Sequence, residues 1–192
     1  MINRCISTSW WVILTLWFTA AASPALTAVA AFTQLQEARV IMPDYADYLG
    51  DDPNSNGRMA AGFVTDPLFR GTDSAQAVFA SLALILLVCA RGKIYRCHSW
   101  LHTVNGILLA LMIALTVWVC TSIAPHMQSL VEAYRTAAAA NDEQQAMFKY
   151  KEMMVVHGIA EPIYASRAGI LLIMIVISGI LSSTPLSKSH AS

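Results

Sequence analysis

The sequence predicts an all-α integral membrane protein in which four transmembrane helices form a bundle. Of the 192 residues, 56% are hydrophobic and only 12% are charged, and the mean hydropathy is +0.53. These values are typical of chains that reside in a lipid bilayer. The apolar residues are concentrated in four segments, 10–31, 75–90, 99–124 and 168–184. Because basic and acidic residues balance and form no basic stripe, nucleic acid is not expected as a partner.

Each of the four segments has the composition of a transmembrane helix. About 20 apolar residues are needed to cross the hydrocarbon core, so 75–90 and 168–184 are short and are expected to use flanking residues. None of the segments contains Lys, Arg, Asp or Glu. A helix satisfies all of its backbone hydrogen bonds internally, as lipid requires. We therefore expect residues 1–192 to form a single membrane domain.

Basic residues near the ends of the segments predict the orientation. Arg91, Lys93 and Arg96 lie between the second and third segments, Arg4 precedes the first, and Lys188 follows the fourth. The positive-inside rule then predicts that both termini lie in the cytoplasm. The membrane expected for the protein is the inner (plasma) membrane. The connections 33–74 and 125–167 are expected outside. The first segment also resembles a signal peptide, with small residues at 28–31, and charge does not decide between an uncleaved and a cleaved form.

The first outer connection, 33–74, is expected to be irregular. Pro43, the turn-forming run 51–57 and Pro67 each interrupt a long helix. Between them, 58–69 has an apolar face and predicts a short helix lying on the outer membrane surface. Asp73 and Ser74 are then expected to cap the second transmembrane helix.

The second outer connection, 125–167, predicts a helical hairpin. Good helix formers occupy 127–140 and 142–156, and Asn141 is a suitable N-cap for the returning helix. The hairpin would project about 20 to 25 Å from the membrane at about 1.5 Å per residue. Counted from Asn141, antiparallel helices bring His126 and His157 to the same height.

A polar stretch at the end of the hairpin contains the candidate binding residues. His157, Glu161, Tyr164 and Arg167 fall within an arc of roughly 120° on one helical face. Ionisable residues near a bilayer suggest a proton relay, an ion path or a ligand contact. The alternative interpretation is an outer-surface anchor in which Arg167 extends its charge to the interface. With His126, these four are the candidates for a cofactor-binding site.

Metal-binding patterns are present but incomplete. His98 and His102 are four residues apart on one helical face, a spacing that suits a transition metal or haem, but also an interfacial cluster. Met153, Met154 and His157 form a local cluster with copper-type ligands. Because no further ligand stands nearby, the sequence predicts no bound metal and no cofactor. It also lacks the motifs of nucleophilic, phosphate-binding and zinc-dependent enzymes, so no catalytic residue is assigned.

Four stretches of the chain are similar to those of a known family: SPALTAVAAF, AAGFVTDPLF, IAPHMQSL and MFKYKEMMVVHGIAEPIYASRAGILL. In these stretches the chain resembles a family of uncharacterised bacterial four-span membrane proteins. That family is related to small eukaryotic transmembrane proteins implicated in platinum-drug resistance. The matching positions are Pro24, Phe32, Ala61, Gly62, Phe69, Pro125, Phe148 and His157. The resemblance implies a four-helix bundle and no established chemistry.

These patterns favour a non-enzymatic protein that is a structural or docking component of a membrane assembly. Gly106 and Ala110, at four-residue spacing, suit close contacts between helices. The expected partners are the lipid bilayer and other membrane-protein subunits. One alternative is a haem- or copper-type metal-binding bundle that uses His126 with His157, or His98 with His102. Another is a small transporter that uses Glu161.

Overall fold

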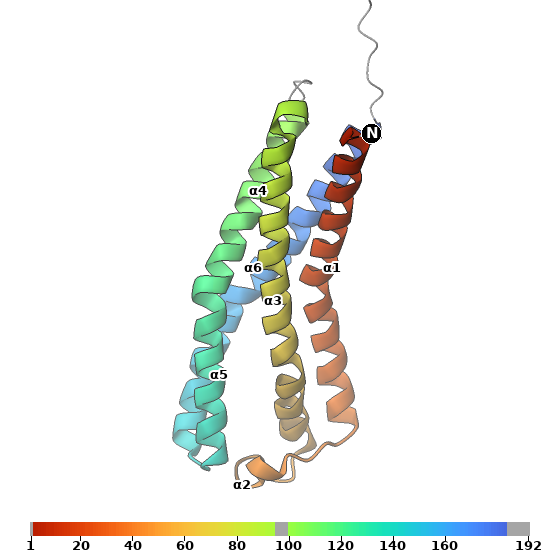
Figure 1. Cartoon of the computed structure of the whole chain (residues 1–192). Coiled ribbons are helices and arrows are strands. Elements are labelled where there is room, and N and C mark those ends of the chain that lie inside the picture. The colour runs from red at the N-terminus through yellow and green to blue at the C-terminus, as the bar shows by residue number, and fades with distance from the viewer. Residues whose placement is uncertain (1, 95–99, 184–192) are drawn as a thin grey trace, which may run out of the picture.

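The computed structural model describes residues 2–94 and 100–183, and in this part of the chain all regular structure is helical. Four helices are long and apolar enough to cross a membrane, as the sequence predicts. They form one elongated bundle, α1(Ile2–Glu37), α3(Pro53–Ile94), α4(Trp100–Trp118) and α6(Glu143–Ser183), with α5(Ala124–Ala139) extending α4 (Figure 1). The fold class is thereby confirmed.

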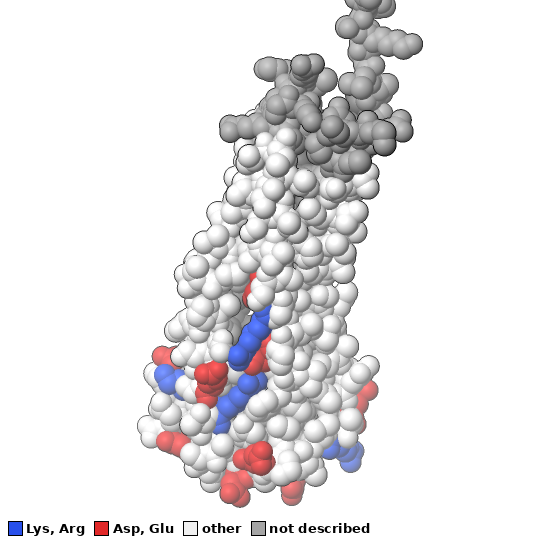
Figure 2. All heavy atoms as spheres, in the orientation of Figure 1, with Lys and Arg blue, Asp and Glu red and all other residues white. Residues whose placement is uncertain are grey.

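Charge separates the bundle into two halves. Figure 2 shows the Lys, Arg, Asp and Glu side chains gathered at the end that carries α2 and the α5–α6 turn, whereas the rest of the described surface in this view is uncharged. The uncharged part, which we call the apolar half, contains the apolar stretches of the four candidate spans. We call the charged end the outer end, following the sequence-based orientation.

One apolar core holds the four long helices together at bilayer depth. Its buried members come from every one of these helices: Leu14, Trp17, Ala21, Ala80, Ala83, Leu109, Met112, Leu171 and Met174. Large side chains on α1, α4 and α6 meet the alanines of α3. This allows the helix backbones to approach closely and the large side chains to interdigitate.

The α1–α3 connection is built on Asn56. It contains a short 3₁₀ turn, Pro43–Tyr45, and α2(Ala46–Leu49), and the chain reverses at Gly50 with φ 57°. The Asn56 Oδ1 accepts a hydrogen bond of 2.9 Å from the Met42 N–H, and its Nδ2 donates to the carbonyls of Gly50 and Asp52, each at 3.0 Å. Asp52 caps α3, accepting from the backbone N–H groups of Asn54 and Ser55. Hydrogen bonds, first from the Ser55 hydroxyl and then from those N–H groups, lower the pKa of the Asp52 carboxyl.

The predicted surface helix at 58–69 is wrong, because this segment is part of α3. The helix begins at Pro53 and continues through Pro67 into the transmembrane segment. Asp73 and Ser74 therefore lie in the middle of a helix and cap nothing: the Ser74 hydroxyl donates to the Arg70 carbonyl at 3.0 Å. A proline removes one helical hydrogen bond without ending the helix when packing on both sides holds the axis.

The outer helical hairpin has the predicted form. α5 and α6 lie side by side, and the chain reverses at Asn141, which adopts φ 54°. The N-cap is Asp142, not Asn141 as expected, because the Asp142 Oδ1 accepts from the Gln145 N–H at 3.0 Å. Beyond the hairpin, α6 crosses behind α3 and reaches α1 at the opposite end of the bundle (Figure 1).

A π-helical turn, Val119–Ile123, joins α4 to α5. Pro125 lies in the first turn of α5, directly after this π-helical turn. Such wide turns are rare and frequently occur at functional sites. Here the turn carries Cys120 towards α3, where its Sγ lies 3.8 Å from the Asp73 carbonyl oxygen.

Candidate functional site

A cluster of polar side chains is buried at the outer edge of the apolar half of the bundle. It comprises Asp73 and Gln76 from α3, Cys120 from the π-helical turn, and Tyr164 and Arg167 from α6, and we call it the buried polar cluster. Asp73 is 6% exposed, Gln76 1% and Arg167 0%. Fully buried charged residues are rare unless they are paired, so this cluster is the leading candidate site.

Arg167 is the centre of the cluster. Its Nη1 donates to the Asp73 Oδ1 at 3.4 Å, and its Nη2 donates to the Gln76 Oε1. The guanidinium carbon also lies 5.3 Å from the Tyr164 ring centroid. A guanidinium has five N–H donors in a fixed plane, which explains how one side chain engages several partners on a neighbouring helix.

Tyr164 completes the environment of Asp73. The Tyr164 hydroxyl donates to the Asp73 Oδ2 at 2.8 Å, so both carboxylate oxygens are occupied. The Phe69 ring packs edge-on against Tyr164, with the ring centroids 6.2 Å apart. A carboxylate with one cationic and one hydroxyl donor has the partners that a buried anion requires.

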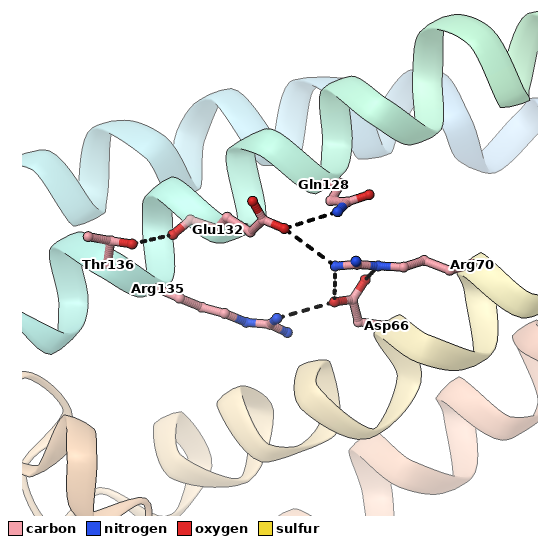
Figure 3. Close-up of polar contacts among 6 residues, drawn as sticks. All are labelled: Asp66, Arg70, Gln128, Glu132, Arg135 and Thr136. Carbon is pink, nitrogen blue, oxygen red and sulfur yellow. Dashed lines mark hydrogen bonds and ion pairs between the residues drawn. The ribbon is translucent and has the colours of Figure 1, made fainter.

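A second set of charges lies further out, between α3 and α5. Arg70 contacts Asp66 at 2.8 Å, Arg135 approaches the same carboxylate at 3.2 Å, and Glu132 lies 3.7 Å from Arg70 (Figure 3). The guanidinium of Arg135 also stacks 3.9 Å from the Phe63 ring centroid. These pairs are partly exposed, so their contribution to stability is small and they mainly fix α5 against α3.

The sequence-predicted candidates divide into two groups. Tyr164 and Arg167 belong to the buried polar cluster, whereas His126, His157 and Glu161 are exposed. No hydrogen bond or ion pair joins His126 to His157 within the described ranges, although both lie on the hairpin. Arg167 forms its ion pair with Asp73 of α3, not with a residue of its own helix.

The metal-binding patterns are not assembled in the described residues. Across 2–94 and 100–183, no group of three or more His, Cys, Asp or Glu side chains is placed to hold a metal ion. His98 lies outside the described residues, as does Cys97, so the predicted pair of His98 with His102 is not placed. Cys89 and Cys120 are free thiols.

Sequence reasoning missed Asp73 and Gln76 as members of the site. Asp73 stands two residues before the second apolar segment, and Arg167 immediately precedes the fourth. Both segments run from the outer end inward, so residues at their starts lie at equal depth. This equal depth is the sequence signal from which a contact between Asp73 and Arg167 could have been predicted.

Comparisons with known proteins give no relative. No protein-family model, no curated protein and no solved structure matches this chain. The resemblance to the bacterial four-span family therefore stays a prediction, and the assignment of the chain rests on its own structure: it is a helical protein with four candidate membrane spans.

Proposed function

We propose that this chain is a non-enzymatic docking component of a membrane assembly, held in the plasma (inner) membrane with both termini in the cytoplasm. The observation that supports it is an apolar stripe on the outer part of α6. Met147, Phe148, Met154, Val155 and Ile159 form this hairpin stripe, and each is 45% to 66% exposed. Their spacings of one, four and seven residues place them on one helical face.

The hairpin stripe continues a lipid-facing surface beyond the length of a bilayer. Leu172, Ile173, Val176 and Ile180 extend the same face into the apolar half, and each is about half exposed. From 147 to 180 an α-helix rises about 50 Å, whereas the hydrocarbon core is about 30 Å thick. Even a tilt of about 40° leaves roughly 38 Å along the membrane normal. The outermost apolar side chains therefore need cover from protein.

Small residues allow a partner helix to approach this face. Gly158, Ala165 and Gly169 are exposed between the two sets of large side chains. A methyl group added at Gly158 or Gly169 would meet nothing within 4 Å. In a bilayer no hydrophobic driving force favours contact between helices. Helices therefore associate there by packing closely over small residues.

The partner that fits is a helix of another membrane subunit, with an apolar face and an acidic residue opposite Lys151. Lys151 is exposed and lies within the hairpin stripe. A second copy, related by a two-fold axis along the membrane normal, would place Lys151 against its own equivalent. Like charges at such a contact are repulsive, which favours a different subunit.

The test is whether a defined complex depends on the stripe. The tagged full chain, extracted in a mild detergent, is expected to purify as a stoichiometric complex with another membrane protein. Val155→Asp should release that protein because it places a carboxylate in the apolar contact, whereas Thr136→Asp, at an exposed position on α5, should retain it. A monomer from the unmodified chain, a homodimer, or a complex that survives Val155→Asp would contradict the proposal.

The buried polar cluster favours a second candidate function, a small proton-linked transporter. Here the support comes from Asp73 and Arg167, because Glu161, the residue expected from the sequence, is exposed. Asp73→Asn should then abolish proton-coupled uptake in vesicles while Glu161→Gln leaves it unchanged. Uptake that is indifferent to Asp73→Asn would remove this candidate.

A further inference from the structure

A groove lies between α3 and the outer part of α4, next to the buried polar cluster. Its volume is about 220 Å³. The lining consists of small, apolar and hydroxyl side chains: Ala77, Ala80, Ser81, Leu84, Ile113, Thr116, Val117, Cys120 and Thr121. The thiol and hydroxyl groups of Cys120 and Thr121 are at its outer end, and Leu84 and Ile113 are at its inner end.

Three buried hydrogen-bond donors near the groove have no acceptor. They are the Arg167 Nε, the Gln76 Nε2 and the Thr116 Oγ1. Thr116 is 2% exposed and lines the groove, and Gln76 precedes the lining residue Ala77. Buried polar groups are nearly always hydrogen-bonded, so a group of three unpaired donors indicates an occupant rich in acceptors.

The helix register places these donors at one level of the bundle. The contact between the Asp73 carbonyl and the Cys120 thiol aligns α3 with the π-helical turn. α3 and α4 are antiparallel, so Gln76, one turn after Asp73, lies level with Thr116, one turn before Cys120. The guanidinium of Arg167 reaches the same level through its bond to the Gln76 Oε1.

We propose that this groove binds a single-chain carboxylate amphiphile, a long-chain fatty acid, from the outer leaflet of the bilayer. The carboxylate would accept hydrogen bonds from Thr116, Gln76 and Arg167, and the chain would lie along Ala80, Leu84, Ile113 and Val117. A carboxylate offers acceptors and no donor, and a guanidinium suits it in geometry and charge.

The order of polarity along the groove selects this class of ligand. The donors lie one turn inward of Cys120 and Thr121, in the outer part of the groove where a head group would lie, and the apolar residues Leu84 and Ile113 continue from them towards the middle of the bilayer, where a chain would lie. Among the three donors Thr116 alone lines the groove, so the carboxylate enters past Thr116, and the side chains around it shift to admit it. The site is on the α3–α4 side of the bundle and does not involve the hairpin stripe.

The test uses a diazirine derivative of palmitic acid with the purified full chain in detergent. Irradiation should give a saturable adduct, one per chain, in 77–84 or 113–121, as located by mass spectrometry. Ser81→Trp, at an exposed groove position, should lower the adduct yield at least tenfold by filling the groove. Val78→Trp, at a position that is 57% exposed and outside the groove lining, should leave the yield unchanged.

Competition with unlabelled lipids tests the head group. Palmitic acid should displace the probe, and methyl palmitate, which lacks the carboxylate charge, should need at least a tenfold higher concentration. Thr116→Val removes the hydroxyl at nearly constant volume. It should weaken the competition by palmitic acid severalfold and change the competition by methyl palmitate little. If Ser81→Trp fails to fold, the competition and Thr116→Val decide.

The proposal is overturned by any of four results. These are labelling without saturation, equal labelling of folded Ser81→Trp and Val78→Trp, equal competition by the acid and its methyl ester, and stronger competition by phosphatidic acid than by palmitic acid. The last result would assign the donors to a phospholipid phosphate.

Discussion

At the scale of single residues, Asn56 shows how one buried amide organises a loop. Its side chain makes three hydrogen bonds to backbone groups of the connection between α1 and α3, and the residue is 1% exposed. Asn is suited to this position because its amide both donates and accepts. From its sequence, the run 51–57 was expected to interrupt a helix. In the structure α3 begins within this run, and Asn56 holds the preceding loop in place through its hydrogen bonds.

Asn56→Ala is expected to lower the free energy of unfolding by about 2 to 3 kcal/mol, because it removes three part-buried hydrogen bonds that hold the connection to the start of α3. Thermal unfolding in detergent, followed by circular dichroism, measures this loss. Asn54→Ala provides the matched control, since Asn54 is exposed and contributes its backbone N–H, not its side chain, to the Asp52 cap. Equal losses for the two variants would show that the hydrogen bonds of Asn56 are not important.

Removing one partner of the Asp73–Arg167 pair is expected to lower the free energy of unfolding much more than replacing both partners with apolar residues. Arg167→Met leaves the buried Asp73 carboxylate without its cation and should lower the free energy of unfolding by about 3 to 5 kcal/mol. The double variant Asp73→Leu with Arg167→Met should recover most of that loss, because neither charge remains buried. Denaturant titration of the two single variants and the double variant measures the coupling; simple additivity would contradict a direct pair.

At the scale of elements, α1 and α3 approach each other closely where Gly57 faces Gln36. A methyl group on Gly57 would lie 2.7 Å from the Gln36 Cα and 2.9 Å from its backbone N. Backbone atoms cannot move aside as a flexible side chain can, so a larger residue forces the two helices apart. The outer ends of α1 and α3 therefore depend on this glycine.

Gly57→Ala is expected to destabilise the protein by about 1 to 3 kcal/mol through this overpacking. Gly71→Ala, also in α3, adds a methyl group that meets nothing within 4 Å, and alanine is the better helix former. That control should be neutral or stabilising by up to about 1 kcal/mol. Thermal midpoints of both variants in the same detergent give the comparison, and a neutral Gly57→Ala would argue against the close approach.

Apolar length predicted the helices well, whereas local signals misplaced their outer ends. The four transmembrane segments follow from runs of apolar residues, which the bilayer requires whatever their neighbours are. Pro67 and Asp73, read as a helix break and a helix cap, are both inside α3. Packing against α1 and α5 overrides such local preferences, and no local pattern reports that packing.

The candidate site was predictable in part for a similar reason. Tyr164 and Arg167 stood out because polar residues beside an apolar segment are conspicuous. Their partners are 91 and 94 residues away in the sequence and depend on how α6 crosses α3. His126 and His157 were placed on the hairpin correctly, but equal height on two helices does not determine which way the side chains face.

At the scale of the whole molecule, the separation of charge makes a prediction about topology. In a variant whose native cysteines are replaced, Gln144→Cys at the exposed tip of the hairpin should react with a membrane-impermeant maleimide in intact cells. Thr8→Cys, exposed at the opposite end, should react only after the membrane is permeabilised. The reversed pattern of labelling would invert the proposed orientation without affecting the bundle.

The π-helical turn Val119–Ile123 determines where this chain tolerates a change in length. Such a turn holds one residue more than the α-helical turn that would replace it. Loss of one residue within it would restore an α-helix and leave Arg135 opposite Asp66. The same deletion one turn away would rotate everything beyond it by about 100° and separate that pair. The turn can thus absorb the loss of one residue between the membrane bundle and the outer hairpin while both keep their register.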